Sequence, residues 1–380
     1  MVTPKAFYDT LAAEGIRFYT GVPDSLLKSL CAYLTDHGGD NYHIIAANEG
    51  NAVGLAAGHH LATGETPVVY MQNSGIGNAV NPLLSLADEA VYSIPMLLVI
   101  GWRGEPGVHD EPQHVKQGAV TLELLNTMGI PCIVLSDDEE KAVGQLRRIA
   151  EDCRVESRPH ASVVRKGIFD KYSLANPVNP HAPLSREEAL KIVVDSLPEG
   201  SVTVSTTGKL SRELFEYRRD TGAGHDHDFL TVGSMGHASS IALGIALRKK
   251  DRKVVCLDGD GALLMHTGAL TTVGGSKADN FIHFIFNNGA HESVGAQPTR
   301  GLGIDIPSIA IASGYRQAVT ASSESEIRDA VRMASENEGP TLIELRVAID
   351  SRENLGRPTT TPIDNKKALM QTLGVKDNMK

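Results

Sequence analysis

The sequence has few cysteines and no long apolar run. Its four cysteines, Cys31, Cys132, Cys153 and Cys256, are widely scattered and show neither paired metal-ligand spacing nor the pattern of a disulfide framework. We therefore expect reduced thiols in the core of a cytoplasmic protein. The first residues lack a signal-peptide apolar segment, and no apolar run is long enough to cross a bilayer, so we expect no membrane partner.

Basic residues are outnumbered by acidic ones. The chain has 36 Lys and Arg against 46 Asp and Glu, a formal net charge of −10. It therefore lacks the overall positive charge of nucleic-acid-binding proteins, and we expect no nucleic-acid partner. An anionic small-molecule substrate would have to be met by cations placed locally in its site.

The sequence does contain a regular alternation of strand-like and helix-periodic segments. We expect strands at 18–21, 43–46, 68–71, 96–101, 132–135, 160–166, 202–205, 229–232, 254–257, 281–286, 316–319 and 341–345. In the first half we expect helices at 4–14, 25–36, 49–61, 77–86, 120–128 and 139–150. This alternation is typical of parallel sheets covered by helices on both faces. We predict an α/β protein with two doubly wound parallel-sheet domains.

A change in composition separates the two halves. Residues 167–184 contain several prolines and little periodicity, which indicates a linker. Ser185 and Glu188 then have the spacing of a capping box that opens a helix. The expected organisation is a first domain at 1–166, the linker at 167–184, a second domain at 185–348 and a tail at 349–380 that indicates no function.

One stretch, 254–294, concentrates groups suited to ligand binding. An apolar run leads into Gly-Asp-Gly at 259–261, a helix-like segment follows, and a second apolar run ends in Asn-Asn at 287–288. Such a unit places its polar groups at the carboxyl ends of parallel strands, where ligands bind. The glycines allow close approach to phosphate oxygens, and Asp260 with an asparagine oxygen gives the hard ligands that Mg²⁺ prefers. The stretch favours a diphosphate held with a divalent cation.

The spacing within this stretch resembles the signature of the thiamine-diphosphate (ThDP) enzymes: Gly-Asp-Gly, 25 residues at 262–286, then Asn-Asn. The resemblance implies ThDP and Mg²⁺ as cofactors and the ThDP-binding fold in both domains, without a middle domain. It implies that Asp260, Asn288 and the carbonyl of Ala290 bind the metal. The cofactor-binding residues implied around the diphosphate are Gly259, Asp260, Gly261, Ala262, Asn288 and His291.

The same resemblance implies roles for three more residues. Glu49 would bind the ring nitrogen N1′ of the aminopyrimidine and stabilise the tautomer whose 4′-imine removes the thiazolium C2 proton; the simpler interpretation is a first-turn acid after an Asn48 N-cap. The carbonyl of Gly233 would accept the 4′-amino proton. Met235 would force the cofactor into its bent form; otherwise it is a core methionine. Both lie in the turn after the strand at 229–232.

Three segments are candidates for loops at the site. Asp24, in the segment 20–25, is equally a helix N-cap or an active-site carboxylate, and the segment 72–82 offers hydrogen-bond donors. Residues 101–118 are rich in glycine and proline, and we expect a long loop there. Related decarboxylases place proton-transfer histidines in the corresponding loop, which makes His109 and His114 catalytic candidates, although a lone loop histidine is as often a bystander.

Within the family, the segments GAHESVGAQPTR and GWRGEPGVHDEPQHVKQG look most like the phosphonopyruvate decarboxylase branch. The resemblance implies decarboxylation of a small anionic 2-oxo acid, 3-phosphonopyruvate, to phosphonoacetaldehyde and CO₂. The chain departs from pyruvate decarboxylases at Val294, where they carry a catalytic glutamate. Sulfopyruvate decarboxylation, carboligation and a catalytically silent ThDP-binding homologue remain alternatives.

A phosphonate substrate needs at least one cation near it. The candidates are Arg103, His109, His114 and His291, followed by Lys116, Lys209, Arg212 and Arg300. The resemblance also implies a homodimer or higher homo-oligomer, with each active site at a subunit interface between the first domain of one chain and the second domain of another.

Overall fold

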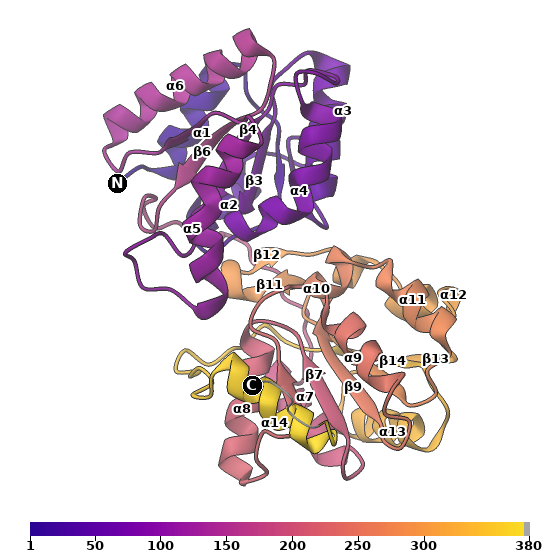
Figure 1. The fold of residues 1–380 in the computed structure, drawn as a ribbon. Coiled ribbons are helices and arrows are strands. Elements are labelled where there is room, and N and C mark those ends of the chain that lie inside the picture. Colours follow the sequence, from indigo (N-terminus) through magenta and orange to yellow (C-terminus); the bar gives the residue numbers. More distant parts are fainter. Residues whose placement is uncertain (376–380) are drawn as a thin grey trace. The chain divides into compact units, whose positions relative to one another are not determined.

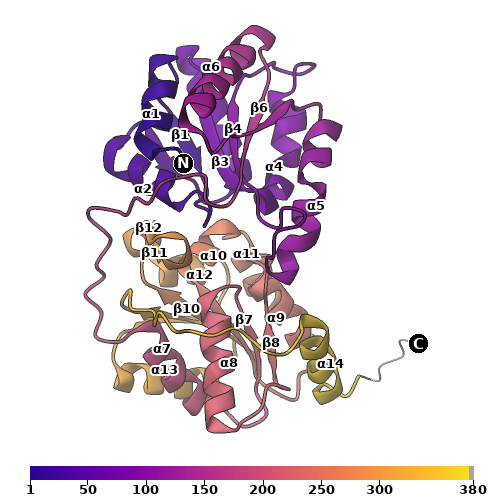
Figure 2. The ribbon, with the colours of Figure 1, turned by 90° about the vertical axis from the view of Figure 1, so that its left-hand side faces the viewer.

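The structure is a computed structural model that describes residues 1–375. The chain divides into two compact units. The first contains Met1–Pro177 and His291–Pro298, and the second contains Val178–Ala290 and the chain from Thr299 onward. Each unit contains a six-stranded sheet with helices on both faces (Figures 1 and 2). The predicted α/β class with two doubly wound sheets is confirmed, and no middle domain lies between the sheets in residues 1–375.

The sheet of the first unit has the strand order β2-β1-β3-β4-β6-β5, with all neighbours parallel. The strands are β1 (Tyr19–Gly21), β2 (His43–Ile45), β3 (Val68–Gln72), β4 (Leu97–Gly101), β5 (Cys132–Val134) and β6 (His160–Val164). On β3, Tyr70 packs into one core and its neighbours Val69 and Met71 into the other. Burial of both faces explains why β3 and β4 are almost entirely apolar in the sequence.

Helices cover both faces of this sheet. One core is formed with α1 (Pro4–Ala13), α2 (Lys28–His37) and α6 (Glu139–Glu156). The other is formed with α3 (Glu49–Thr63), α4 (Ile76–Pro82) and α5 (Pro112–Thr127). The strand order reverses between β1 and β3, so the segments after these two strands lie at the crevice where ligands bind in open α/β sheets. The segment after β2, the parallel neighbour of β1, lies at the same end of the sheet.

The sheet of the second unit has the order β13-β14-β10-β9-β7-β8. Its strands are β7 (Val202–Ser205), β8 (Asp228–Leu230), β9 (Val254–Gly259), β10 (Phe281–Asn287), β13 (Gln317–Ala321) and β14 (Thr341–Arg346). One core is formed with α7 (Arg186–Ser196), α8 (Lys209–Thr221) and α13 (Glu324–Glu336), and the other with α9 (Ala238–Ala246), α11 (Ala269–Ser276) and α12 (Ile306–Ala312). The order reverses between β7 and β9, immediately before the short helix α10 (Asp260–Met265).

Two predicted helix starts are confirmed in detail. The Asn48 side chain accepts a hydrogen bond from the Asn51 amide at 2.9 Å at the start of α3. Ser185 and Glu188 form the predicted capping box at the start of α7. The structure places all twelve predicted strands within two residues of their expected bounds.

The long loop predicted at 101–118 is shorter than expected. Helix α5 begins at Pro112, so the loop ends at Glu111 and His114 lies in the first helical turn. Proline is well tolerated at this position because the amide it lacks would be unpaired there. Gly118 does not break the helix: a side chain at this position would overlap the Gly104 carbonyl, so the glycine allows a close approach of two backbone segments.

Two other segments differ from expectation. The helix predicted at 25–36 begins at Lys28, because the Asp24 side chain accepts hydrogen bonds from the amides of Leu26 and Leu27 and holds a turn there. The helix predicted at 77–86 ends as α4 at Pro82 and continues as a π-helix, Leu83–Ala87.

The tail contains more structure than its composition indicated. Helix α14 (Pro362–Thr372) packs on β8, where Asn365 accepts from the Leu230 amide at 3.0 Å and donates to the Asp228 carbonyl at 2.7 Å. The end of the predicted tail, 376–380, lies outside the described residues. In the rest of the chain, none of the helices has the length and apolar character needed to span a membrane.

Candidate active site

Glu49 is the buried acid of the first unit. It opens α3 directly after the Asn48 cap, and only 5% of its surface is exposed. Burial raises the pKa of its carboxyl group, while a hydrogen bond from Asn78 Nδ2 to Glu49 Oε2 at 2.7 Å opposes this shift. A raised pKa favours the protonated carboxyl, which can share its proton with a ring nitrogen.

Gly75 shapes the space around this acid. It ends the short 3₁₀ turn Asn73–Gly75 after β3, and a Cβ atom there would overlap the Glu49 carboxylate. At Gly77, two residues later, a Cβ atom would have no described atom within 4 Å. The sequence indicated that the segment 72–82 carried donors, but it did not indicate that glycine was required at residue 75.

These two glycines make a matched pair of variants. Gly75→Ala should displace the Glu49 carboxylate and reduce kcat by at least about 10-fold, whereas Gly77→Ala should leave kcat within about 2-fold, because a misplaced catalytic group alone can cost about 100-fold. Steady-state turnover of both variants at saturating cofactor tests this. Equal effects of the two substitutions would contradict a spatial role for Gly75.

Asp24 has structural features that suit each of the two roles the sequence left open. Its Oδ2 atom caps the turn before α2, while Oδ1 is buried without a hydrogen-bond partner in residues 1–375. Burial raises the pKa of this carboxyl to about 6. The hydrogen bond from the Leu26 amide and the positive charge of Arg103 lower the pKa, but they do not offset the effect of burial. Asp24 follows β1 and can therefore carry a proton at the same end of the sheet as Glu49.

A cavity of about 230 Å³ lies at the end of β4 and is lined by Ser25, Leu26, Trp102, Arg103, Gly104, Glu105, Val108, His109, Asp110 and Lys166. Arg103 forms a two-pronged ion pair with Asp110 and donates from Nη1 to Ser25 Oγ at 2.8 Å. His109 is exposed at this cavity, whereas His114 is buried at the start of α5. The two histidine candidates thus have different surroundings.

The predicted metal ligands lie together in the second unit. Asp260 begins α10 after β9, and Asn288 and Ala290 follow β10, the neighbouring strand. All three residues are buried. Burial raises the pKa of the Asp260 carboxyl to about 6, and the Thr299 hydroxyl, which donates to Asp260 Oδ2, opposes the shift. The Asn288 Oδ1 atom accepts a hydrogen bond from the Ala290 amide at 3.1 Å.

The turn with Gly233 and Met235 lies next to the same helix. A Cβ atom at Gly236 would lie 2.9 Å from the Ala262 carbonyl of α10 and 2.6 Å from the His266 ring. Met235 is partly exposed and belongs to neither core of the unit. This turn therefore lies beside α10. His291, in contrast, falls in the short strand β11 (Ala290–His291), at the start of the segment 291–298 that belongs to the first unit.

Comparison with known proteins identifies relatives that align with this chain over most of their length and most of its own. The chain is 34% identical over 369 residues to a phosphonopyruvate decarboxylase of Streptomyces viridochromogenes, covering 93% of this chain and 90% of the relative. It is 34% identical over 381 residues to that of Streptomyces hygroscopicus, covering 95% and 92%. A sulfopyruvate decarboxylase of Methanosarcina acetivorans is 28% identical over 347 residues, covering 85% and 86%.

Family models match both units. The model of the N-terminal TPP (thiamine pyrophosphate, or ThDP) binding domain of thiamine pyrophosphate enzymes matches residues 1–125, and that of the C-terminal TPP binding domain matches residues 206–345. The chain belongs to the thiamine pyrophosphate enzymes. The predicted family and its ThDP cofactor are confirmed.

The residues of this thiamine pyrophosphate enzyme fit the cofactor and its metal. Asp260, Asn288 and the Ala290 carbonyl offer only oxygen atoms, the donor set of Mg²⁺. Gly259 leaves open space: no described atom lies within 4 Å of a Cβ position there, so a phosphate can approach the backbone. In the first unit, Glu49 provides the buried acid.

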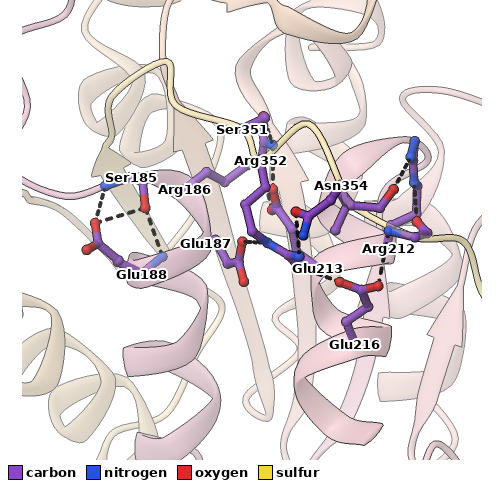
Figure 3. Close-up of polar contacts among 12 residues, drawn as sticks. Ser185, Arg186, Glu187, Glu188, Arg212, Glu213, Glu216, Ser351, Arg352 and Asn354 are labelled. Carbon is purple, nitrogen blue, oxygen red and sulfur yellow. Dashed lines mark hydrogen bonds and ion pairs between the residues drawn. The ribbon is translucent and has the colours of Figure 1, made fainter. Parts of the chain in front are cut away.

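One cation predicted as an anion ligand, Arg212, is engaged elsewhere. Arg212 donates to the carbonyls of Gly356 and Leu355 at 2.8 and 3.0 Å, and Figure 3 shows it next to the segment that follows β14. In the same view, Arg352 lies between Glu187 and Glu216 and ion-pairs with both. Arg186 pairs with the buried Glu213 at 2.6 Å. These contacts hold the segment 351–356 on α7 and α8, so Arg212 has a structural role.

A second cluster of possible metal ligands carries no metal assignment. Cys256, Asp258 and His283 are buried, with ligand atoms within 4.8 Å of one another. Burial raises the pKa of the Cys256 thiol well above its ordinary value, which disfavours the thiolate that binds metals. Asp258 Oδ1 also accepts the Gly259 amide at 3.0 Å. The cluster is better explained as a polar core next to the start of α10.

Proposed function

We propose that this thiamine pyrophosphate enzyme is an Mg²⁺-dependent carboxy-lyase that converts 3-phosphonopyruvate to phosphonoacetaldehyde and CO₂. The observation that carries the proposal is the presence of Glu49, Asp260 and Asn288 in buried positions, in a chain that aligns over nine-tenths of its length with two phosphonopyruvate decarboxylases. A catalytically silent homologue would not need to keep a costly buried acid in each unit.

The second unit would hold the cofactor's diphosphate. Asp260, Asn288 and the Ala290 carbonyl are the proposed ligands of the Mg²⁺ that binds it, and the backbone at Gly259–Ala262 would contact phosphate oxygens. The turn with Gly233 and Met235 would support the cofactor's bent form. When bound, ThDP supplies the electron sink for the carbanion left by loss of CO₂.

The first unit would supply the proton chemistry. Glu49 would hold a proton against ring nitrogen N1′, because burial favours its protonated form. The family glutamate of pyruvate decarboxylases is replaced by Val294, so another group must deliver the proton to the product carbon. We assign this step to Asp24, whose pKa of about 6 keeps a fraction protonated near neutral pH. His109 and His114 are the next candidates.

The cavity at the end of β4 would receive the phosphonate. It presents Arg103, His109 and Lys166, and charge-assisted hydrogen bonds from such groups suit a multiply charged anion. The Asp110 carboxylate fixes the Arg103 guanidinium in one orientation. Burial alone would raise the pKa of Asp110, but the hydrogen bonds that it accepts outweigh burial and lower this pKa. We keep His291 as a secondary candidate for the substrate or diphosphate.

We also propose a homodimer as the smallest active form. The acid Glu49 and the metal ligands lie on different compact units of the chain. The family resemblance pairs the first unit of one subunit with the second unit of another. Activity that persists undiminished in a monomer isolated at high dilution would overturn this arrangement.

A substrate comparison tests the proposed reaction. With Mg²⁺ and ThDP, kcat/KM for phosphonopyruvate should exceed that for pyruvate by about 10- to 100-fold, the value of one or two lost hydrogen bonds to a charged group. A coupled assay of aldehyde release measures both, with sulfopyruvate as a third substrate. Preference for pyruvate would reject the phosphonate assignment, preference for sulfopyruvate would favour that alternative, and no turnover of any 2-oxo acid would favour a binding protein.

A further inference from the structure

Asn287, the first residue of the Asn-Asn pair, lies at the centre of a hydrogen-bond network beside the proposed metal ligands. It is wholly buried at the end of β10. Its Nδ2 atom donates to the Gly301 carbonyl at 2.9 Å and to Glu344 Oε1 at 2.6 Å, and its Oδ1 atom accepts from the Gly289 amide at 3.1 Å. One side chain therefore holds two backbone segments that flank the metal site.

Glu344 determines which way this amide points. It lies on β14, the neighbour of β10, and is not exposed to solvent. Its other contacts are the Thr320 hydroxyl at 2.9 Å and the Arg346 guanidinium at 3.0 Å. A buried carboxylate accepts hydrogen bonds only, so the Asn287 NH₂ group must face it and the Asn287 oxygen must face Gly289. If the Asn287 amide were turned the other way, its oxygen would face the Glu344 carboxylate, and neither group could donate a hydrogen bond.

Thr299 completes the connection to Asp260. Its amide donates to the Gly289 carbonyl at 2.8 Å, and its hydroxyl donates to Asp260 Oδ2. The Gly301 amide donates to the Thr299 hydroxyl at 3.1 Å. The segment Thr299–Gly301 is thus bonded both to the first proposed ligand and to the chain that carries Asn288 and Ala290.

Gly301 shows how tightly this network is packed. A Cβ atom there would lie 2.7 Å from Asn287 Oδ1 and 2.7 Å from Asp260 Oδ2. Gly303, in the same 3₁₀ turn, has no described atom within 4 Å of its Cβ position. A side chain at residue 301 would therefore push apart the two groups that the network brings together.

We propose that Glu344, acting through Asn287, is a positioning residue of the metal site. Glu344 fixes the orientation of the Asn287 amide, and this amide aligns the Gly289–Ala290 backbone. Through the segment Thr299–Gly301, the same amide also positions the Asp260 carboxylate. The inference rests on the proposed function, because it assumes that Asp260, Asn288 and Ala290 bind Mg²⁺. Residues that orient metal ligands without touching the metal typically change affinity by about 10- to 100-fold when replaced.

The test is Glu344→Gln, which keeps the size of the side chain and removes its charge. Its amide group can no longer accept from Asn287, Thr320 and Arg346 together. The Mg²⁺ concentration that half-saturates ThDP binding, measured by isothermal titration calorimetry, should rise by about 10-fold. The value of kcat at saturating Mg²⁺ should fall by less than about 3-fold, because excess metal restores the occupied site.

Asp228→Asn is the matched control. Asp228 is also a wholly buried carboxylate paired with an arginine, Arg218 at 3.1 Å, but it lies on β8 at the opposite end of the strand order. It should leave the Mg²⁺ requirement unchanged, whatever its effect on the melting temperature of the metal-free protein. A purely structural role of Glu344 predicts the same behaviour for Glu344→Gln, and that result would overturn the inference.

A second pair of variants covers the case in which Glu344→Gln does not fold. Gly301→Ala should raise the half-saturating Mg²⁺ concentration by at least about 10-fold, and Gly303→Ala should leave it unchanged. Equal values for the two would contradict the network. Failure of the proposed function is recognised separately, because the unmodified protein would then show no Mg²⁺-dependent binding of ThDP in the same calorimeter.

Discussion

Replacement of Glu49 by glutamine is expected to reduce kcat by about 10²- to 10⁴-fold, the range attributed to a positioned acid or base. Glutamine keeps the shape of the side chain and can still accept the hydrogen bond from Asn78. It cannot share a titrating proton with a ring nitrogen. Because the proposed ligands of the diphosphate and the metal are on the other unit, the ThDP dissociation constant should change much less than kcat.

The measurement is turnover at saturating ThDP and Mg²⁺, together with the ThDP dissociation constant from calorimetry. Glu65→Gln is the control, since Glu65 is a partly exposed glutamate paired with His59 just beyond the end of α3. It should leave kcat within about 2-fold. Full activity of Glu49→Gln would show that the tautomer role assigned to Glu49 is wrong.

The stability of the same variant provides an independent check. A carboxyl whose pKa is raised by folding stabilises the folded protein less as the pH rises above its ordinary value of 4.5. Cofactor-free Glu49→Gln should therefore melt at the same temperature as the unmodified protein or higher at pH 8, and the difference should shrink as the pH falls towards 4.5. A lower melting temperature for the variant at pH 8 would mean that the ionised carboxylate stabilises the fold.

The fold was predictable because its determinants are local in the sequence. The strands at 68–71 and 96–101 are buried on both faces, so each is an uninterrupted apolar run in the sequence. The caps formed by Asn48 and Ser185 depend on neighbours only three residues away. Signals of this kind do not depend on the rest of the structure, which explains why the strands and these helix starts agree with expectation.

The start of α5 was missed for the opposite reason. The glycines at 104 and 118 have the composition of a loop, but they are there because two backbone segments approach each other closely. A contact between residues so far apart in the chain leaves no periodic pattern in the sequence. The helix at 362–372 was missed in a similar way, since it is stabilised by the contacts of Asn365 with β8, far away in the chain.

The same distinction separates the site residues that could be predicted from the sequence from those that could not. Glu49, Asp260 and Asn288 could be named because they occupy fixed positions in motifs of the family. Gly75, Asn287, Thr299 and Glu344 could not, because each acts on a motif residue through space. Glu344 lies 57 residues from Asn287 and looks like an ordinary charged residue at the end of a strand. Only the register of β10 with β14 brings it to the site.

Replacement of Asp260 by alanine is expected to weaken Mg²⁺-dependent ThDP binding by at least about 100-fold, because removal of a direct ligand should exceed the roughly 10- to 100-fold effect of outer residues. Chelation of Mg²⁺ from the unmodified protein should cause the same loss. Asp279→Asn, at an exposed aspartate before β10, is the control and should bind ThDP normally. Retention of Mg²⁺-dependent affinity by Asp260→Ala would remove the basis for the metal assignment.

Asp260→Asn separates the loss of charge from the loss of structure. Burial raises the pKa of the Asp260 carboxyl from 3.8 to about 6, so the metal-free protein loses stability as the pH rises through this interval and the group ionises. The asparagine variant cannot ionise. Its metal-free form should therefore melt at a higher temperature than the unmodified protein at pH 8, by a margin that disappears near pH 4, while its Mg²⁺ affinity is lost. A variant that is destabilised at pH 8 and still binds Mg²⁺ would show that Asp260 supports the fold instead of the metal.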